Sequence, residues 1–512
     1  MIRRTRARIA AYTRRRLALG ALALAAVSAW AAGCELDALR GAPVRTGTAQ
    51  TLGMFSTELP DSLEEQALRA LEQDARRREN RFLDALEPGH LHRATAVNQD
   101  EIESGLWRSD EIFELGAQLF NLTFTPAMGY GGADQPHLSR IHAGQRGGPD
   151  AMQCASCHWR GGPAGAGDGA DNAYLDGDGD TQSSALARNP ITLHGAGLVE
   201  ILAAEMNAEL ARQRDALLAL ASQTGAPQRA PLSAKGVSFG ELVARPDGLI
   251  DVTDVEGIDP DLVIKPFGWK GNIATLRDAV EDALLVHHGM QSAHLVGSAP
   301  PARIGPFGGL DPDGDGITDE IGEGQVTALT LFVAMQEVPA LSLPADEEQL
   351  LTWAKGQARF VDLGCATCHV PSLPLESTHY VLASRSGGAP ITIDLAAEGA
   401  EPRIAPAADG SGYRVALFSD LKRHNVGPDL AEPRPDRGVL FDQLLTRPLW
   451  GVARSRPYLH DARAPTLEDA ILLHGGEAKA SRDAYEALSD VDRAPIRVYL
   501  TALTRARRMI SP

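Results

Sequence analysis

Apolar residues recur at helical spacing in several stretches of the chain. In the segment 61–86 they return every three or four residues, and acidic side chains stand four positions before arginines, as in Glu65 and Arg69. This pattern predicts an amphipathic helix. Further helices are expected at about 197–222, 275–288, 325–338, 347–362, 466–474 and 490–503. Because alternating apolar and polar runs are scarce, the sequence predicts a mainly α fold with long loops.

The first 33 residues are typical of an export signal. Seven arginines, with no acidic residue among them, precede a run of small and apolar residues from Leu17 to Ala32. The run is too short and too rich in alanine for a membrane-spanning helix. It closes on Ala31-Ala32-Gly33-Cys34, which resembles the lipobox of bacterial lipoproteins. We therefore expect a periplasmic protein held at a membrane by a lipid on Cys34, with plain secretion after a nearby cleavage as the alternative.

The charge of the chain excludes one class of partner. The 512 residues carry a net charge of −18, which becomes −25 once the seven arginines of the leader are removed. Binding to nucleic acid requires a basic surface, so no nucleic-acid partner is expected. A basic redox partner protein is compatible with this charge. The length, about three times that of a typical domain, predicts two or three domains.

Two short cysteine motifs carry the clearest chemical signal. Both have the pattern Cys-x-x-Cys-His, with Cys154, Cys157 and His158 in the first and Cys365, Cys368 and His369 in the second. Two thiols at this spacing can bond the two vinyl groups of one haem, and the next imidazole then binds the iron as the proximal ligand. A zinc site or a redox dithiol is the alternative, but neither requires a histidine after both pairs. Two covalently bound c-type haems are therefore expected.

The two halves of the chain repeat one order of motifs. Each cysteine motif is followed by an Arg-Asn-Pro or Arg-Pro segment, and then by a stretch that begins at a threonine and ends in His-Gly. These stretches begin at Thr275 and Thr466. We expect two related cytochrome c-like haem domains. The expected boundaries are 1–33 for the signal peptide, 34–106 for a tether and the amphipathic helix, 107–345 for the first haem domain and 346–512 for the second.

Longer stretches carry a resemblance to a known family. They are 188–200, 266–270, 447–451, 459–463 and 474–477. In this order they resemble the di-haem oxidoreductases described as thiol oxidoreductases or peroxidases, which are distant relatives of bacterial di-haem cytochrome c peroxidases and of the methylamine-utilisation enzyme that oxidises protein side chains. The resemblance covers most of residues 107–505. It implies that peroxide reacts at one haem while the other haem relays electrons.

The sequence departs from the peroxidases at two positions. Gln443 stands where the peroxidases have the methionine that ligates the electron-transfer haem. No tryptophan occurs in 181–187, where they have an aromatic bridge between the haems. Trp159, beside His158, is a candidate for that bridge, or a ring that packs on a haem edge.

Candidate distal iron ligands come from the motifs that the resemblance covers. A single histidine is more often structural than an iron ligand, so the ranking stays open. The ranked candidates are His424, His288 and Met290.

Asp278 is the candidate catalytic acid–base residue. The resemblance puts the distal acid of the peroxidases at this position, on the helix that Thr275 opens. A buried carboxyl group there could accept the first proton of peroxide and return it to the leaving oxygen. The alternative is that Asp278 caps or pairs within its helix, in which case the acid is expected at Glu281 or Asp282.

Two acidic, glycine-rich loops are candidate calcium sites. The first places carboxylates on alternate residues before Gly316, as a calcium loop requires, but position twelve is Gly322 rather than glutamate. The second, at 176–180, is shorter. Related di-haem enzymes hold structural calcium between domains, so the resemblance favours calcium, with a solvated acidic turn as the alternative. The candidate ligands in the first loop are Asp311, Asp313 and Asp315.

Two classes of function remain open. The first is a peroxidase-like oxidoreductase that reduces a small oxidant such as hydrogen peroxide, with electrons from a redox partner protein. The second is a non-enzymatic di-haem electron-transfer cytochrome with both irons six-coordinate. The family resemblance and the differences between the two halves favour the enzyme.

Overall fold

A computed structural model describes residues 96–131, 140–142, 145–147, 150–175, 182–296, 316–317, 320–339, 342–385, 387–396, 404, 407, 410 and 412–504. Nearly all of them belong to one compact unit, formed by residues 71–405 and 412–512. The expected signal peptide, the lipidation site at Cys34, the helix at 61–86 and both acidic loops up to Asp315 lie outside the described residues. Across the part of the chain that is described, no helix has the length and hydrophobicity needed to cross a membrane.

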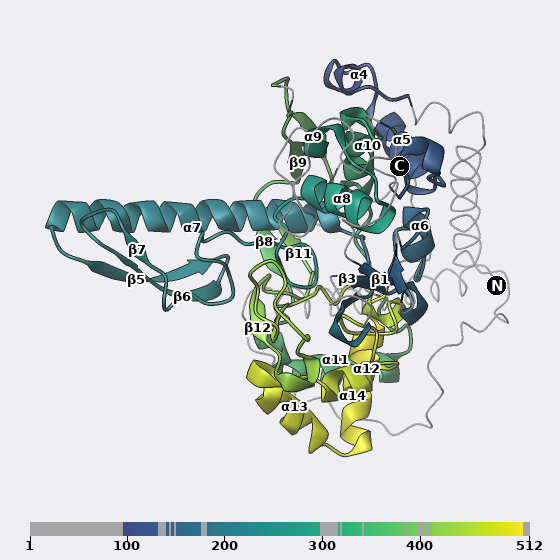
Figure 1. Cartoon of the computed structure of the whole chain (residues 1–512). Helices are drawn as coiled ribbons and strands as arrows, with labels where there is room; N and C mark the ends of the chain where they lie inside the picture. Colours follow the sequence, from purple (N-terminus) through teal and green to yellow (C-terminus); the bar gives the residue numbers. More distant parts are fainter. Residues whose placement is uncertain are drawn as a thin grey trace, which may run out of the picture. The chain divides into compact units, whose positions relative to one another are not determined.

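Helices supply most of the regular structure (Figure 1). They are α4 (Gln99–Glu103), α5 (Ser109–Phe120), α6 (Cys154–Cys157), α7 (Ala196–Thr224), α8 (Leu276–Ala283), α9 (Ala293–Val296), α10 (Glu323–Ala334), α11 (Glu347–Asp362), α12 (Leu467–Leu472), α13 (Lys479–Glu486) and α14 (Asp490–Thr501). Helix α8 continues into a π-helix, η5 (Leu284–His288). All six helices expected after residue 190 are confirmed, with ends within a few residues of the expected ones.

The repeated threonines cap equivalent helices in the two halves. The Thr275 hydroxyl accepts a hydrogen bond from the Asp278 amide at the start of α8, and the Thr466 hydroxyl accepts one from the Asp469 amide at the start of α12. A side-chain oxygen at this position satisfies an amide that has no partner within the helix. The local chemistry of the repeat is therefore preserved in the structure.

Helices α5 and α10 cross closely in the larger hydrophobic core. Phe332 of α10 packs between Phe113 and Phe120 of α5, with ring centroids 5.0 Å apart in both pairs. Gly116 lies at the crossing, where an added Cβ would collide with the Ala328 carbonyl. The close approach of the two backbones therefore requires glycine.

Helices α11 and α14 build a second core near the end of the chain. Tyr499 of α14 packs against Trp353 and Phe360 of α11, with ring centroids 5.6 and 5.4 Å apart. Figure 1 shows α11, α12, α13 and α14 gathered together. The helices on both sides of the second cysteine motif thus share a core of their own.

A three-stranded antiparallel sheet packs along the C-terminal part of α7 (Figure 1). Its strands are β5 (Gln228–Ala234), β6 (Val237–Ala244) and β7 (Ile250–Asp251), in the order β5-β6-β7. Leu232 and Phe239 are buried, while Pro231, Ser233 and Ser238 beside them along the strands are exposed. The two-residue turn at Lys235 and Gly236 has positive φ at both positions, the conformation that suits a tight hairpin.

The remaining strands are short and form small sheets around the loops. A four-stranded sheet has the order β2-β1-β3-β4, and three two-stranded sheets pair β8 with β11, β9 with β10 and β12 with β13. Their bounds are Arg140–His142 (β1), Gln145–Gly147 (β2), Ala173–Leu175 (β3), Leu186–Arg188 (β4), Leu373–Leu375 (β8), His379–Leu382 (β9), Ile391–Asp394 (β10), Tyr413–Val415 (β11), Arg423–Asn425 (β12) and Gln443–Leu445 (β13).

The expectation of a mainly α fold is wrong. Of the described residues, 40% are helical and 16% lie in strands, which is a mixed α/β content. Many of the strands are three residues long, so they pair through backbone hydrogen bonds without a readable alternation of apolar residues. The longer hairpin at 228–244 does alternate, but alanine, proline and serine weaken the pattern.

Candidate functional site

Both cysteine motifs open into one cavity. The first forms α6, with His158 directly after it, and the second forms η6 (Cys365–Thr367), followed by Cys368 and His369. All six motif side chains line a cavity of about 640 Å³. The fold therefore brings together two motifs that lie far apart in the sequence.

The two motif histidines are held in the same way. Nδ1 of His158 lies 3.0 Å from the Ile191 carbonyl, and Nδ1 of His369 lies 3.1 Å from the Phe418 carbonyl. Each Nδ1–H thus donates to the backbone, which leaves Nε2 as the ligand atom, the arrangement typical of metal-binding histidines. Burial lowers the pKa of both rings to about 4, so the neutral form needed for binding iron is favoured.

The four thiols do not assemble a zinc site. Within the described ranges, the one group of three or more metal-ligating atoms lying within 4.8 Å of one another combines Cys368 with Asp420 and His424. Burial raises the pKa of Cys154 to about 12 and that of Cys365 to about 11. Zinc binds thiolates, and a structural zinc site needs four converging ligands. The alternative of a shared zinc ion is therefore not supported by this geometry.

His474 is paired with His369, although sequence reasoning did not rank it as a ligand. Their ring centroids are 6.4 Å apart, and Nδ1 of His474 donates to the Ala470 carbonyl at 2.7 Å. Two imidazoles that bind one metal ion from opposite sides have centroids roughly 6 Å apart, since each metal–nitrogen bond is about 2 Å long. The pair has the spacing of a bis-histidine site. The available signal was the repeat itself, because His474 ends the second threonine-capped segment.

His424, the first-ranked distal candidate, is engaged elsewhere. Its Nε2 lies 2.8 Å from Asp420 and its Nδ1 lies 2.7 Å from Glu477. Burial acts to lower the pKa of His424, but the hydrogen bond to Asp420 outweighs it and the pKa is raised. With both ring nitrogens donating to carboxylates, neither is left to bind iron.

The other two distal candidates are not placed opposite His158. Nε2 of His288 lies 3.5 Å from the Cys154 sulfur, a group that would bond the rim of a haem rather than its iron, and its Nδ1 donates to the Ala151 carbonyl at 2.7 Å. Met290 is 1% exposed, in the larger core, and does not line the cavity. Within the described ranges, no imidazole makes a ring contact with His158 like that between His369 and His474, although, besides burial, the charge of His287 acts to lower the pKa of His158.

Asp278 lies outside the cavity wall. Its carboxylate accepts a hydrogen bond from the Thr275 hydroxyl at 2.7 Å and pairs with Arg385 at 3.2 Å, and its side chain is 51% exposed. This geometry favours the capping alternative. Glu281 accepts a hydrogen bond from Ser292 at 2.6 Å, whereas Asp282 lines the cavity and pairs with Arg437.

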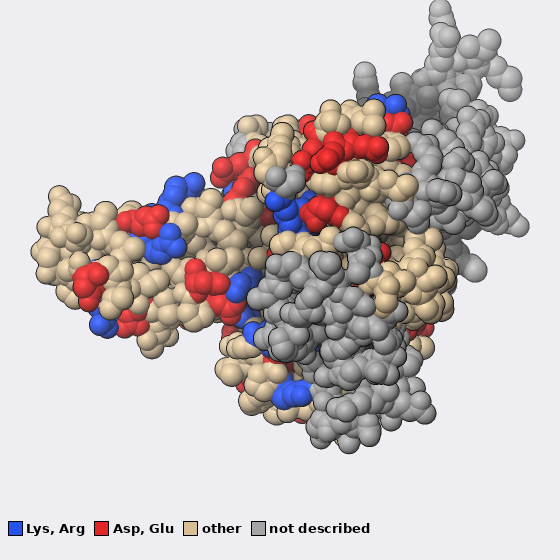
Figure 2. All heavy atoms as spheres, turned by 45° about the horizontal axis from the view of Figure 1, so that its top comes forward, with Lys and Arg blue, Asp and Glu red and all other residues tan. Residues whose placement is uncertain are grey.

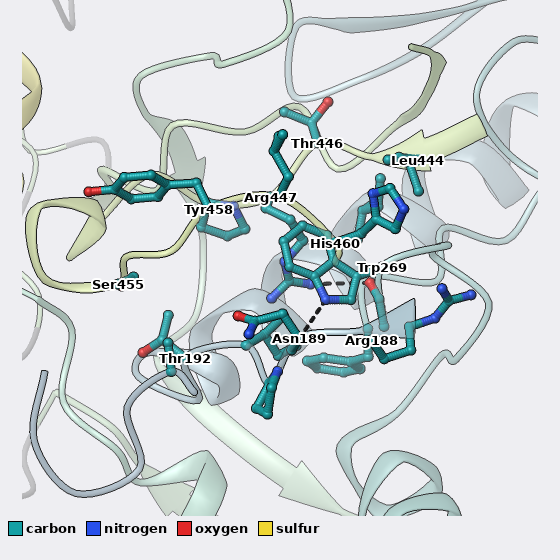
Figure 3. Close-up of a pocket in the computed structure, with 18 of the residues that line it drawn as sticks. Arg188, Asn189, Thr192, Trp269, Leu444, Thr446, Arg447, Ser455, Tyr458 and His460 are labelled. Carbon is teal, nitrogen blue, oxygen red and sulfur yellow. Dashed lines mark hydrogen bonds between the residues drawn. The ribbon is translucent and has the colours of Figure 1, made fainter. Parts of the chain in front are cut away.

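The middle of the cavity is built around Trp269 (Figure 3). The Trp269 indole N–H donates to the Asn189 carbonyl at 2.8 Å, and the ring meets His460 edge-on with centroids 6.5 Å apart. Arg447 lies over the same indole at 5.9 Å. Trp269 and Asn189 come from the first half of the chain, and His460 and Arg447 come from the second. The two halves therefore meet at this tryptophan.

Two polar groups beside Trp269 have unmet bonding capacity, the half-buried Arg447 and the buried His460. Arg447 donates to the Gly268 carbonyl at 3.3 Å, and none of the acidic side chains in the described residues pairs with it. Burial lowers its pKa to about 10. Nδ1 of His460 is buried without a hydrogen-bond partner in the same region. Because an unpaired buried cation is costly, the cavity suits a group that carries carboxylates, and haem does. The residues present fit haem.

Gln443 and Trp159, which were singled out where the sequence departs from the peroxidases, both lie away from the centre of the cavity. Gln443 begins β13 and does not line the cavity. Trp159 is 46% exposed, and its indole N–H donates to Asp171 at 2.9 Å. Trp269, by contrast, contacts residues of both halves of the chain.

Comparisons with known proteins support the family resemblance over part of the chain. No curated protein matches the chain. Among solved structures, hydrazine synthase of Kuenenia stuttgartiensis pressurised with 20 bar xenon is 14% identical, with a TM-score of 0.32 over 90% of this chain and 100% of that chain. That TM-score is too low to carry an argument. The resemblance expected from the motifs is confirmed in the second half of the chain, where residues 330–503 match the model of the family “Di-haem oxidoreductase, putative peroxidase”.

Proposed function

We propose that the protein is an exported di-haem c-type cytochrome that reduces peroxide. The observation that carries the proposal is the single cavity lined by two complete Cys-x-x-Cys-His motifs, whose histidines both present Nε2. Cys154 and Cys157 would hold one haem, and Cys365 and Cys368 the other. Bound haem iron supplies the chemistry of binding peroxide and exchanging electrons. The match to a di-haem oxidoreductase family supports this reading.

The surroundings of His158 and His369 differ, and this difference favours different roles for the two motifs. His369 has His474 as a partner, so both imidazoles would hold the second haem iron, and this site suits electron relay. His158 has no such partner within the described residues, so the first site can admit a small oxidant. This asymmetry favours an enzyme over an electron carrier with two six-coordinate irons.

The electron donor in this proposal is a redox partner protein with a basic surface. The chain is acidic, with a net charge of −18. Figure 2 shows Asp and Glu side chains gathered in clusters over the described part of one face. Opposite charges accelerate the encounter of redox proteins.

The test of the proposal combines haem counting with spectroscopy. A pyridine haemochrome assay of the denatured protein should give two c-type haems per chain. The oxidised protein should show one high-spin and one low-spin haem by electron paramagnetic resonance, and after reduction it should consume hydrogen peroxide. Two low-spin haems and no peroxide consumption would establish the electron-carrier alternative instead.

Trp269 is expected to carry electrons between the two halves. Replacing Trp269 with leucine should slow the transfer of electrons from the second haem to the first while both haems are retained, because the aromatic ring between the halves is lost. Trp159→Leu is the matched control, since Trp159 is half exposed and lies beside one motif alone. Stopped-flow absorbance after mixing reduced protein with peroxide measures both variants. Equal rates in wild type and Trp269→Leu would contradict the relay role.

A further inference from the structure

A histidine and a buried carboxylate lie side by side in the cavity wall next to the first motif. Nδ1 of His287 is 2.8 Å from the Asp150 carboxylate. The Asp150 side chain is 4% exposed and that of His287 is 34% exposed. Both line the cavity together with Cys157 and His158. The pair is therefore closed to bulk solvent on the aspartate side and open to the cavity on the histidine side.

Backbone hydrogen bonds fix the two residues to each other. The Asp150 amide donates to the His287 carbonyl at 2.9 Å. One residue further along each segment, the Ala151 carbonyl accepts a hydrogen bond from Nδ1 of His288. His287 belongs to the π-helix η5, a conformation that often marks functional sites. The segment that leads into α6 is thus anchored to the end of η5.

The hydrogen bond to Asp150 determines which nitrogen of His287 can react. Nδ1–H donates to the carboxylate, so Nε2 is left to accept and return a proton. Within the described ranges, Nε2 of His287 has no hydrogen-bond partner. A carboxylate-held imidazole with one free nitrogen is the arrangement used for general acid–base catalysis.

We propose that His287 is the acid–base residue for peroxide reduction at the first haem and that Asp150 is its positioning residue. The assignment rests on the proposed function. The other candidates are less suitable, because Asp278 lies outside the cavity wall and Asp282 is paired with Arg437. His288 has Nδ1 bonded to the backbone and Nε2 directed at Cys154.

Hydrogen peroxide takes up two protons and two electrons and gives two molecules of water. Nε2 of His287 accepts a proton from the first oxygen of peroxide and donates it to the second oxygen. The second oxygen leaves as water with the electron pair of the broken O–O bond. The redox partner protein supplies two electrons and solvent supplies two protons, and the first oxygen leaves as the second molecule of water.

The experiment compares two oxidants that differ in their need for an acid. Hydrogen peroxide must be protonated as its O–O bond breaks, whereas peracetic acid already has a good leaving group. His287→Gln in the haem-loaded protein is expected to lower the rate of hydrogen peroxide reduction by about 10² to 10⁴ and the rate with peracetic acid far less. Asp150→Asn should show the same selectivity with a smaller loss, because it keeps the shape of the side chain while removing its charge. His379→Gln, an exposed histidine on β9, is the matched control and should leave both rates unchanged.

The outcomes separate the assignment from the proposed function. Equal losses with both oxidants would overturn the acid–base role, because a structural defect does not distinguish leaving groups. Conversion of a low-spin haem to high spin in His287→Gln would also overturn it, since His287 would then be an iron ligand. If the wild type reduces neither oxidant, the proposed function fails, and the assignment fails with it.

Discussion

Replacing His474 with alanine is expected to convert the second haem from low spin to high spin. His369 and His474 lie at the spacing of two ligands on one iron, and His474 has its Nδ1 tied to the Ala470 carbonyl. Removing this ring takes away one of two strong nitrogen ligands. Electron paramagnetic resonance of the oxidised variant should therefore show the high-spin signal of two haems where the wild type shows that of one. Added imidazole should restore the low-spin signal by filling the vacated position.

His424→Ala is the matched control for this variant. His424 lies near the same motif, but both its ring nitrogens donate to carboxylates. The low-spin signal should survive its replacement. Loss of the signal in His424→Ala and its retention in His474→Ala would reverse the assignment of the distal ligand.

Local sequence chemistry predicted the helices and the motifs well. The threonine caps of α8 and α12 are made by residues three positions apart, so the sequence contains the whole interaction. The spacing within each cysteine motif is local in the same sense. These features could be recognised without knowing the rest of the fold.

Features that depend on distant segments were missed. The motifs ranked His424 first as a distal ligand. Whether a histidine can bind iron depends on its neighbours in the fold, and both ring nitrogens of His424 are hydrogen-bonded, to Asp420 and Glu477. Asp278 has the right position in its motif, yet Arg385, 107 residues further along the chain, pairs with it away from the cavity. The His287–Asp150 pair joins two segments whose proximity no local pattern reveals.

The strands were missed for a related reason. A three-residue strand such as β12 is defined by its backbone pairing with β13, with Arg423 opposite Leu445. Periodicity cannot detect an element shorter than two repeats of its own pattern. The mixed α/β content therefore follows from contacts between loops, which composition and spacing do not encode.

A buried ion-pair network beside the cavity holds the two halves of the chain together. Lys270, from the first half, pairs with Glu432 of the second half at 3.1 Å, and both side chains are 1% exposed. Lys270 also donates to the Leu440 carbonyl at 2.7 Å. Arg188 pairs with Glu432 and with Asp436. The network thus balances two cations against two carboxylates away from water.

Replacing Lys270 with methionine is expected to lower the free energy of unfolding by about 3 to 5 kcal/mol, because the two buried carboxylates of the network then face one cation, Arg188. Methionine keeps the length and the apolar stem of the side chain, so the loss reports on the charge. Urea denaturation of the haem-loaded protein measures it. Lys479→Met is the matched control, since Lys479 is 61% exposed in its pair with Asp483, and it should change stability by less than about 1 kcal/mol. Adding Glu432→Gln to Lys270→Met should cost less than the sum of the two single changes, because the second substitution removes the stranded charge; strict additivity would show that the two residues do not act as a pair.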